Sequence, residues 1–134
     1  MKHINDVRIQ EIIPLISPYE LKKKHRVNES LLEQVENQRK TISDIVSGRD
    51  SRLLGVVGPC SIHDTKAAVE YAQKLSKLSE KIQDRIFIVM RTYFEKPRTV
   101  LGWRGLILDP YLDGTYHIAD GLELARKILL EISN

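Results

Sequence analysis

Two loops of the chain combine the residue types that bind metals or anions, and each follows an apolar run of strand length. The first loop has the sequence GPCSIHD over residues 58–64, directly after Leu53–Val57. Ligands of α/β sheets and barrels bind at the C-terminal ends of the strands. As a thiolate, Cys60 could bind a divalent transition metal or attack an electrophile, with His63 nearby. One Cys and one His are too few to complete a metal site, and a buried structural cysteine is the alternative.

The second loop has the sequence RTYFEKPRT over residues 91–99 and follows the apolar run Ile86–Met90. Its arginines can hold carboxylate and phosphate oxygens in a bidentate manner, and its lysine acts as a mobile point charge. A proline fixes the backbone between two of these cations. The strand-end position favours an anionic small-molecule site over a solvated loop in which Glu95 neutralises one cation. The residues expected to bind are Arg91, Lys96, Arg98 and Thr99, with Pro97 as the proline that fixes the backbone between Lys96 and Arg98.

The elements that carry these loops follow the order strand, helix, strand, loop, helix. After the first loop, Asp64 can cap a helix whose apolar side chains share one face up to Ile82. A polar loop rich in glycine and proline extends from Arg91 to about Tyr116, and a further helix begins near Ile118. The two continuous apolar runs are typical of strands buried on both faces. This order predicts an α/β fold with parallel strands.

The length of the chain limits how much of such a fold it can contain. The 134 residues suffice for one modest domain. The two strands start at Leu53 and Ile86, about one strand–helix unit of roughly 30 residues apart. An eight-fold barrel needs ~250 residues, and an isolated two-stranded sheet is only marginally stable. We therefore expect the chain to be a fragment of a longer protein.

Residues 1–50 have the character of an extension with helical content. Asn28 or Ser30 can cap a helix, and Ser30 with Glu33 has the spacing of a capping box. Gly48 ends the helical pattern. Further upstream, several isoleucines between residues 9 and 16 could line a short helix or an arm, limited by prolines. The apolar residues at helical spacing are Leu31, Leu32, Val35, Ile42, Ile45 and Val46.

Composition excludes several classes of protein. Apolar residues make up 42% and charged residues 29%, close to the average of soluble globular chains. The net charge of +3 is too small and too mixed to predict nucleic-acid binding, and the basic run at residues 22–26 is expected to be a solvated linker. No run approaches the ~18 apolar residues of a membrane span. Without a signal-peptide pattern, and with Cys60 as the single cysteine, a cytoplasmic protein is expected.

The two loops together identify a family resemblance. GPCSIHD at residues 58–64 followed by MRTYFEKPRT at residues 90–99 closely resembles the type I 3-deoxy-D-arabino-heptulosonate 7-phosphate (DAHP) synthases. The similarity continues through GWRGLI and DP at residues 102–110 and is dense over residues 38–134. The sequences RTY at residues 91–93 and GLELA at residues 121–125 are most similar to those of the tryptophan-sensitive isoenzymes. These long, ungapped motifs are much more specific than a lone glycine pattern.

The resemblance implies a fold and a reaction. Members of this family are metal-dependent (β/α)₈ TIM barrels. They condense phosphoenolpyruvate with erythrose 4-phosphate and water and release phosphate, which is the first step of the shikimate pathway to aromatic amino acids. Residues 51–134 would then be the first two strand–helix units of an incomplete barrel. Residues 1–50 would be a helical extension that serves oligomerisation or regulation.

The resemblance also implies residue roles. Cys60 corresponds to a metal ligand, and Arg91 corresponds to the arginine that contacts phosphoenolpyruvate. Lys96 corresponds to the lysine between the two substrates, and the motif that ends in Arg98 and Thr99 holds the phosphate of erythrose 4-phosphate. The remaining metal ligands, a His, a Glu and an Asp, would come from later strands.

The implied cofactor is a divalent metal ion, which could be Mn, Fe, Co or Zn. The implied partners are the two substrates, an aromatic amino acid as feedback effector, with tryptophan favoured, and further copies of the chain in a homo-oligomer. A non-catalytic effector-binding or oligomerisation module is the alternative. The motif match excludes another sugar-phosphate aldolase.

Overall fold

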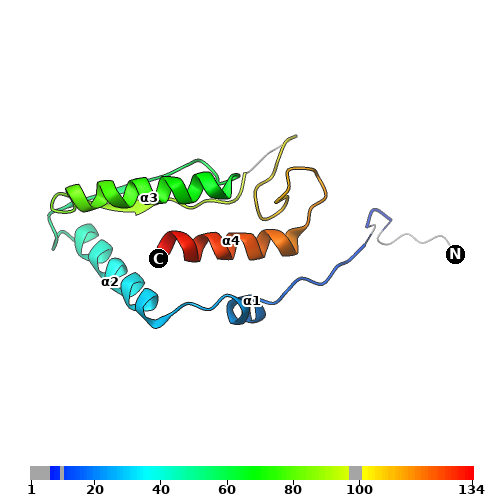
Figure 1. Ribbon diagram of the computed structural model, residues 1–134, viewed down its shortest axis with the longest axis horizontal. Coiled ribbons are helices and arrows are strands. Elements are labelled where there is room, and N and C mark those ends of the chain that lie inside the picture. The colour runs from blue at the N-terminus through cyan, green and yellow to red at the C-terminus, as the bar shows by residue number, and fades with distance from the viewer. Residues whose placement is uncertain (1–6, 10, 97–100) are drawn as a thin grey trace.

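The helices and strands follow the order expected of an α/β chain. The computed structural model describes residues 7–9, 11–96 and 101–134, and the elements below belong to this part of the chain (Figure 1). The strand and helix bounds predicted downstream of residue 50 are confirmed to within a few residues. The elements are α1 (Pro18–Lys24), α2 (Glu29–Val46), β1 (Leu53–Val57), α3 (Thr65–Ile82), β2 (Ile86–Met90) and α4 (Ile118–Ser133).

The two strands pair in parallel, as predicted. The register runs from Leu53 opposite Ile86 to Val57 opposite Met90, so the two C-terminal ends are level. Helix α3 makes the crossover between the strands, and α4 packs beside α3 (Figure 1). Asp64 caps α3 by accepting a hydrogen bond of 3.0 Å from the backbone N–H of Ala67. This arrangement places both strand-end loops at one edge of the sheet.

The prediction that both strands are buried on both faces is wrong for the described residues. In β1, the side chains of Leu53 and Val56 are 68% and 62% exposed. The cause is the small number of neighbours, because each strand pairs with a single partner among the described residues and helices do not cover both faces of the sheet. The apolar character of β1 therefore exceeds what the described part of the chain covers.

The start of α2 differs in detail from the prediction. Asn28 is the N-cap, and its side chain accepts a hydrogen bond of 2.7 Å from the backbone N–H of Leu31. Ser30 lies inside the helix, where its hydroxyl donates to Asn28, so the predicted box with Glu33 does not form. The side-chain oxygen of Asn28 already caps the first turn, so the helix starts before Ser30. At the other end, Gly48 follows the helix with φ +74°, as expected for a helix stop.

A capping box does form one helix earlier. Ser17 accepts from the backbone N–H of Glu20, and the Glu20 carboxylate accepts from the backbone N–H of Ser17. Pro18 occupies the first helical turn of α1, where its missing N–H costs nothing. Upstream, residues 11–17 form neither helix nor strand, and Ile12 is 83% exposed. Of the two alternatives for this segment, the arm is the one that forms, and it extends away from the rest of the chain (Figure 1).

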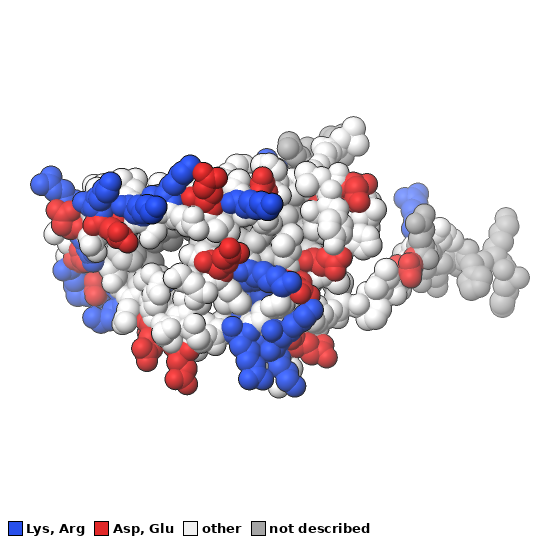
Figure 2. All heavy atoms as spheres, viewed as in Figure 1, with Lys and Arg blue, Asp and Glu red and all other residues white. Residues whose placement is uncertain are grey.

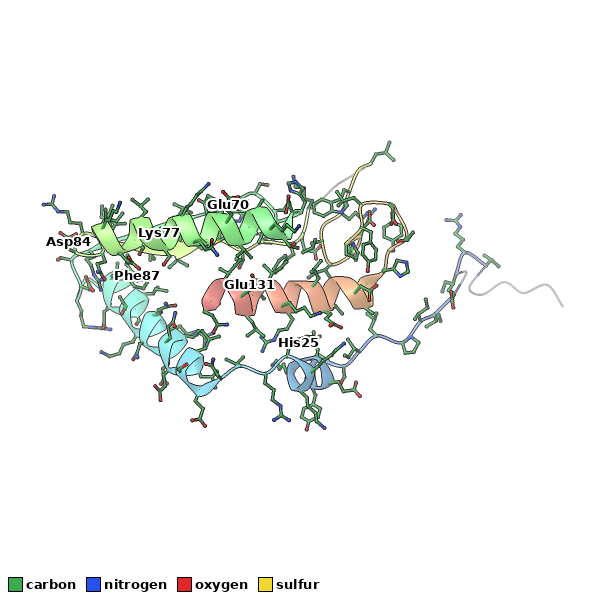
Figure 3. The ribbon with its side chains drawn as sticks, in the orientation of Figure 1. His25, Glu70, Lys77, Asp84, Phe87 and Glu131 are labelled. Atoms are coloured by element: carbon green, nitrogen blue, oxygen red, sulfur yellow. The ribbon has the colours of Figure 1, made fainter. Side chains whose placement is uncertain are left out.

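The basic run at residues 22–26 is more than a solvated linker. Lys24 Nζ lies 2.6 Å from Oε2 of Glu123 on α4, and Nε2 of His25 lies 3.2 Å from Oε1 of the same carboxylate. The guanidinium of Arg126 also donates to the carbonyl of His25 at 3.3 Å. His25 thus lies at the junction of α1 and α4 (Figure 3), and this part of the prediction is corrected.

Charges elsewhere on the surface are mixed. Figure 2 shows basic and acidic side chains interspersed over the visible face, with basic side chains gathered along its lower edge, where α1 lies in Figure 1. Lys22, Lys23 and Lys24 form the last turn of α1. None of the described helices is long and apolar enough to span a membrane.

The buried core lies directly beneath the strand-end loops. It joins Ile62 of the first loop, and Phe94 and Leu106 of the long segment after β2, to the facing sides of α3 and α4. Burial of these side chains supplies the hydrophobic stabilisation that ties the loops to the helices. The cluster consists of Ile62, Ala68, Phe94, Leu106, Ala125 and Ile128.

Candidate functional site

Parallel pairing brings the two predicted loops together. The backbone N–H of Arg91 donates to the carbonyl of Val57 at 2.7 Å, which continues the strand ladder past the end of β2. Further along, the N–H of Ile62 donates to the carbonyl of Tyr93, also at 2.7 Å. The first loop therefore lies along the beginning of the second loop. The described parts of the two predicted loops therefore share one edge of the sheet.

Gly58 permits this close approach. Its φ is +154°, in the region that favours glycine, and a Cβ at this position would lie 2.5 Å from the carbonyl oxygen of Arg91. Any other residue would push the two loops apart. The glycine of the first loop is therefore a geometric requirement of the site.

Cys60 is exposed, so the alternative of a buried structural cysteine is wrong. Cys60 lies three residues after the C-terminal end of β1 and is exposed among the described residues. Among the described residues no group of three or more His, Cys, Asp or Glu side chains could hold a metal ion. The donor chemistry of an accessible thiol suits one position of a divalent transition-metal site, and the other ligands would have to come from elsewhere.

Arg91 lies beside Cys60. Its Nη2 donates to the carbonyl oxygen of Cys60 at 3.2 Å, and its guanidinium carbon lies 4.8 Å from the centre of the Tyr93 ring. The hydrogen bond and the cation–π contact orient the guanidinium while the side chain stays exposed. Arg91 keeps further N–H donors for an anion, because a guanidinium carries five of them.

The second loop folds back on itself. The N–H of Lys96 donates to the carbonyl of Arg104 at 2.9 Å, and Glu95 and Gly105 form an antiparallel bridge. Gly105 has φ +126°, and a Cβ there would overlap the Phe94 carbonyl. Residues 94–96 and 104–106 therefore lie side by side and form a narrow neck, which includes Lys96.

Three of the predicted binding residues, Pro97, Arg98 and Thr99, lie outside the described residues. The structure thus brings together Cys60, Arg91 and the neck that carries Lys96. The roles assigned to these residues remain predictions.

Two residues of this neighbourhood were not singled out from the sequence. The indole Nε1 of Trp103 donates to the carbonyl of Asp109 at 2.7 Å. The Trp103 ring also meets the ring of His63 edge to face, with centroids 6.3 Å apart and planes 80° apart. Asp109 is only 5% exposed, and both of its carboxylate oxygens accept from the N–H of Gly114 at 3.2 Å. The one signal in the sequence was the single tryptophan between Gly102 and Gly105.

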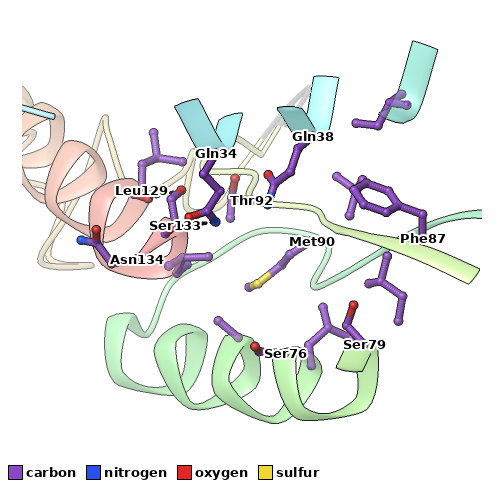
Figure 4. Close-up of a pocket in the computed structure, with 16 residues that line it drawn as sticks. Gln34, Gln38, Ser76, Ser79, Phe87, Met90, Thr92, Leu129, Ser133 and Asn134 are labelled. Atoms are coloured by element: carbon purple, nitrogen blue, oxygen red, sulfur yellow. Dashed lines mark hydrogen bonds between the residues drawn. The ribbon is translucent and has the colours of Figure 1, made fainter. Parts of the chain in front are cut away.

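A cavity of about 350 Å³ lies apart from these loops (Figure 4). It is enclosed by α2, α3, β2 and the C-terminal end of α4, and the side chain of Gln34 donates to the carbonyl of Ser133 across it at 3.3 Å. Among the described residues, Thr92 is its one contribution from the two strand-end loops, and neither Cys60, Arg91 nor Lys96 lines it. The cavity is therefore separate from the Cys60–Arg91 neighbourhood.

Known proteins similar to this chain agree with the motifs. The chain is 51% identical over 133 residues to the Trp-sensitive phospho-2-dehydro-3-deoxyheptonate aldolase of Buchnera aphidicola subsp. Baizongia pistaciae, and this covers 99% of the chain and 38% of that protein. It is 47% identical over 131 residues to the Tyr-sensitive enzyme of Escherichia coli K12, covering 98% of the chain and 37% of that protein. The chain thus spans about 38% of the length of its curated relatives.

A solved structure shares the fold. The phospho-2-dehydro-3-deoxyheptonate aldolase of Francisella tularensis superimposes with a TM-score of 0.89 at 46% sequence identity, covering 93% of this chain and 37% of that one. The profile of the DAHP synthetase I family matches residues 23–132. On the combined strength of the strand-end motifs, the fold and this match, the chain belongs to the DAHP synthetase I family.

Proposed function

We propose that the full-length protein containing this chain condenses phosphoenolpyruvate with D-erythrose 4-phosphate and water to form DAHP and phosphate, the first step of the shikimate pathway. The observation that carries the proposal is the contact of the Arg91 guanidinium with the Cys60 loop at the C-terminal ends of two parallel strands. A cation contacts the main chain of the cysteine that would bind the metal, at the strand ends where barrel enzymes bind their substrates. The family and the names of its members supply the reaction.

The proposal includes the (β/α)₈ barrel. Residues 51–134 would be its first two strand–helix units, and residues 1–50 would be the extension that precedes it. Two features support this division. The parallel pair with its α3 crossover is the repeating unit of such a barrel. In addition, β2 pairs with β1 alone among the described residues, and the cavity beside β2 offers space next to the strand (Figure 4).

Cys60 would hold a divalent metal ion, Mn, Fe, Co or Zn, as a thiolate ligand. Its exposure and its position at the end of β1 fit that role. A metal ion bound there would polarise the aldehyde of erythrose 4-phosphate as a Lewis acid. Since a metal ligand must be deprotonated, oxidation of the thiol would remove this ligand.

The chain's own cations would then bind and orient the substrates. Arg91 would hold phosphoenolpyruvate through its remaining guanidinium donors. Arg98 and Thr99, on a backbone stiffened by Pro97, would hold the phosphate of erythrose 4-phosphate. In this geometry C3 of phosphoenolpyruvate attacks the aldehyde carbon, water adds at C2, and phosphate leaves. Lys96, between the two substrates, would donate a proton or a hydrogen bond to the oxygen that becomes the new hydroxyl.

The extension would serve regulation and assembly. Its arm exposes apolar side chains, Ile12 at 83% and Ile13 at 66%, as expected of a segment that packs on another surface. We propose that it contributes to a homo-oligomer and to feedback inhibition by an aromatic amino acid, with tryptophan favoured. A non-catalytic module that binds effector or partner is the second candidate, and the same exposed arm is what favours it.

The test is a reconstitution of the full-length enzyme. Metal-free protein is supplied with Mn, Fe, Co or Zn and both substrates, and DAHP and phosphate are measured together. We expect metal-dependent formation of the two products in equal amounts, and stronger inhibition by tryptophan than by tyrosine or phenylalanine. Folded full-length protein that forms no DAHP with any of the four metals would contradict the enzyme and favour the module.

A further inference from the structure

Trp103 touches both strand-end loops. It lies in the long segment from Arg91 to Tyr116 that continues the second loop, and its ring meets the His63 ring of the first loop edge to face at 6.3 Å between centroids. Aromatic pairs prefer this geometry at centroid separations of about 4.5–7 Å. The body of the indole packs against the buried cluster around Leu106. No other contact between aromatic rings joins these two loops among the described residues.

The orientation of the indole is fixed from behind. Its N–H donates to the carbonyl of Asp109 at 2.7 Å, a short hydrogen bond. Asp109 itself has little freedom, because its N–H donates to Gly105 at 3.0 Å and its buried carboxylate accepts from Gly114. These hydrogen bonds therefore fix the orientation of the indole ring that contacts His63.

The partner of Trp103, His63, lies in the same loop as Cys60. His63 is three residues after Cys60, between Ile62, whose N–H is bonded to Tyr93, and Asp64, which caps α3. A hydrogen bond from the backbone N–H of Ala67 lowers the pKa of Asp64, as expected of an N-cap carboxylate. Although His63 is exposed, its contact with Trp103 thus ties down the one residue between these two anchored neighbours, in the loop that carries the thiol.

The other end of the connection is Lys96. Its backbone N–H is bonded to the carbonyl of Arg104, the residue directly after Trp103, and its neighbour Glu95 bridges to Gly105. Trp103 therefore directly precedes the residue that pairs with Lys96. One side chain spans from the neck of the lysine loop to the cysteine loop.

We propose that Trp103 is a positioning residue that couples the Cys60 loop to the Lys96 loop, with Asp109 fixing its indole and His63 receiving the contact. The proposal rests on the proposed function and assigns it a further residue. Trp103 acts through its neighbours on the placement of the Cys60 loop and of Lys96, which would contact both substrates. Arg91 shares one hydrogen bond with the Cys60 loop, but its backbone continues the β1–β2 ladder and its guanidinium lies over Tyr93, so phosphoenolpyruvate binding should depend on Trp103 less.

The test uses full-length enzyme with Trp103→Leu, which removes both contacts, and Trp103→Phe, which keeps a ring but loses the N–H donor. Tyr111→Phe is the matched control. This change removes a hydrogen bond to Asp120 within the same segment between β2 and α4, and the first loop takes no part in that bond. Three quantities are measured: the Kd of metal-free enzyme for Mn²⁺ alone, the KM for each substrate, and amide hydrogen exchange of residues 58–64. For Trp103→Leu we expect faster exchange in residues 58–64 and a Kd for Mn²⁺ and a KM for erythrose 4-phosphate each raised ~2- to 10-fold, with a nearly unchanged KM for phosphoenolpyruvate.

The outcomes separate positioning from mere stability. A lower kcat at unchanged Kd, unchanged KM values and unchanged exchange would mean fewer folded molecules and would overturn the proposal. If Trp103→Leu does not fold, Trp103→Phe decides, since loss of the Asp109 hydrogen bond should still raise the exchange rate of residues 58–64. If the unsubstituted enzyme forms no DAHP, the proposed function fails by itself, while metal affinity and exchange still test the coupling. If it also binds no Mn²⁺, the exchange of residues 58–64 is the deciding measurement.

Discussion

The guanidinium of Arg91 donates a hydrogen bond of 3.2 Å to the main-chain carbonyl of Cys60. Two residues expected to hold different ligands are therefore in direct contact across the ends of β1 and β2. The contact uses one donor of the guanidinium and no atom of the thiol, so both functional groups remain available. Substitution of either residue should consequently have a distinct and separable effect.

Arg91→Ala in the full-length enzyme should weaken phosphoenolpyruvate binding more than erythrose 4-phosphate binding. Loss of a charge-assisted contact costs ~2–4 kcal/mol, or roughly 30- to 1000-fold in catalytic efficiency. Titration of each substrate measures the division. Arg104→Ala is the control, because this exposed arginine of the same loop contributes its backbone carbonyl to the neck, which the substitution keeps. Equal, small losses from both variants would favour a solvated loop.

Cys60→Ala should abolish metal binding and activity and leave the fold intact. The thiol is exposed, and substitutions at exposed positions change stability by only about 0.5 kcal/mol. Metal content after dialysis, turnover and the thermal transition are the measurements. Survival of both metal affinity and turnover would show that Cys60 is not a ligand.

Arg98→Ala should mainly lose binding of erythrose 4-phosphate. The residue lies outside the described residues, and the prediction comes from the family motif. The expected loss is again ~2–4 kcal/mol, roughly 30- to 1000-fold in kcat/KM. The KM for each substrate is compared with that of Arg91→Ala, which should show the opposite pattern. A larger effect on phosphoenolpyruvate than on erythrose 4-phosphate would reverse the assignment of the two arginines.

Glu123→Gln should release α1 from α4. The ammonium groups of Lys127 and Lys24, at 2.8 and 2.6 Å, lower the pKa of Glu123 from 4.5 to about 2. A lowered carboxyl pKa contributes stability that is fully present above pH 4.5 and is lost as the pH falls toward 2. The protection of residues 18–25 against amide exchange, taken relative to an unstructured chain at the same pH, should therefore fall in the unsubstituted protein as the pH drops through this range. In the Gln variant this protection should already be low at neutral pH.

Glu131→Gln is the matched control for this effect. Glu131 is exposed on the same helix (Figure 3) and forms no salt bridge with a described residue. Its substitution should leave the exchange of residues 18–25 unchanged. An equal increase in both variants would mean that helix α4 as a whole, and not the Glu123 cluster, holds α1.

The 134-residue chain by itself should be inactive and should unfold without a cooperative transition. It supplies two parallel strands, and Leu53 and Val56 of β1 remain largely exposed. A sheet of two strands is marginally stable. Differential scanning calorimetry and a DAHP assay of this chain test the prediction. A sharp thermal transition together with product formation would refute it.

Local patterns in the sequence were sufficient for the elements around the site. The apolar runs of β1 and β2, the Asp64 cap and the helical spacing of α3 and α4 are short-range signals, so their positions could be predicted. The common edge of the two loops followed from parallel pairing. Burial was predicted less well, because exposure of β1 depends on which strands and helices cover it and not on its own residues.

The N-terminal region shows the limit of local reasoning. Two residues could cap α2, and the geometry of the chain decided for Asn28 over Ser30. The lysines of α1 were expected to be solvated, because nothing near them in the sequence pairs with them. One of them, Lys24, pairs with Glu123, which is 99 positions away.

The sequence by itself determined the α/β class, the family and the residues expected to bind metal and substrates, because these are carried by contiguous motifs. The tertiary structure alone decided that the thiol of Cys60 is exposed, that Arg91 contacts its loop, and that Trp103 spans from Asp109 to His63. The physical reason is common to all three. Each depends on how segments distant in the chain pack around the buried core, and packing is a property of the assembled elements.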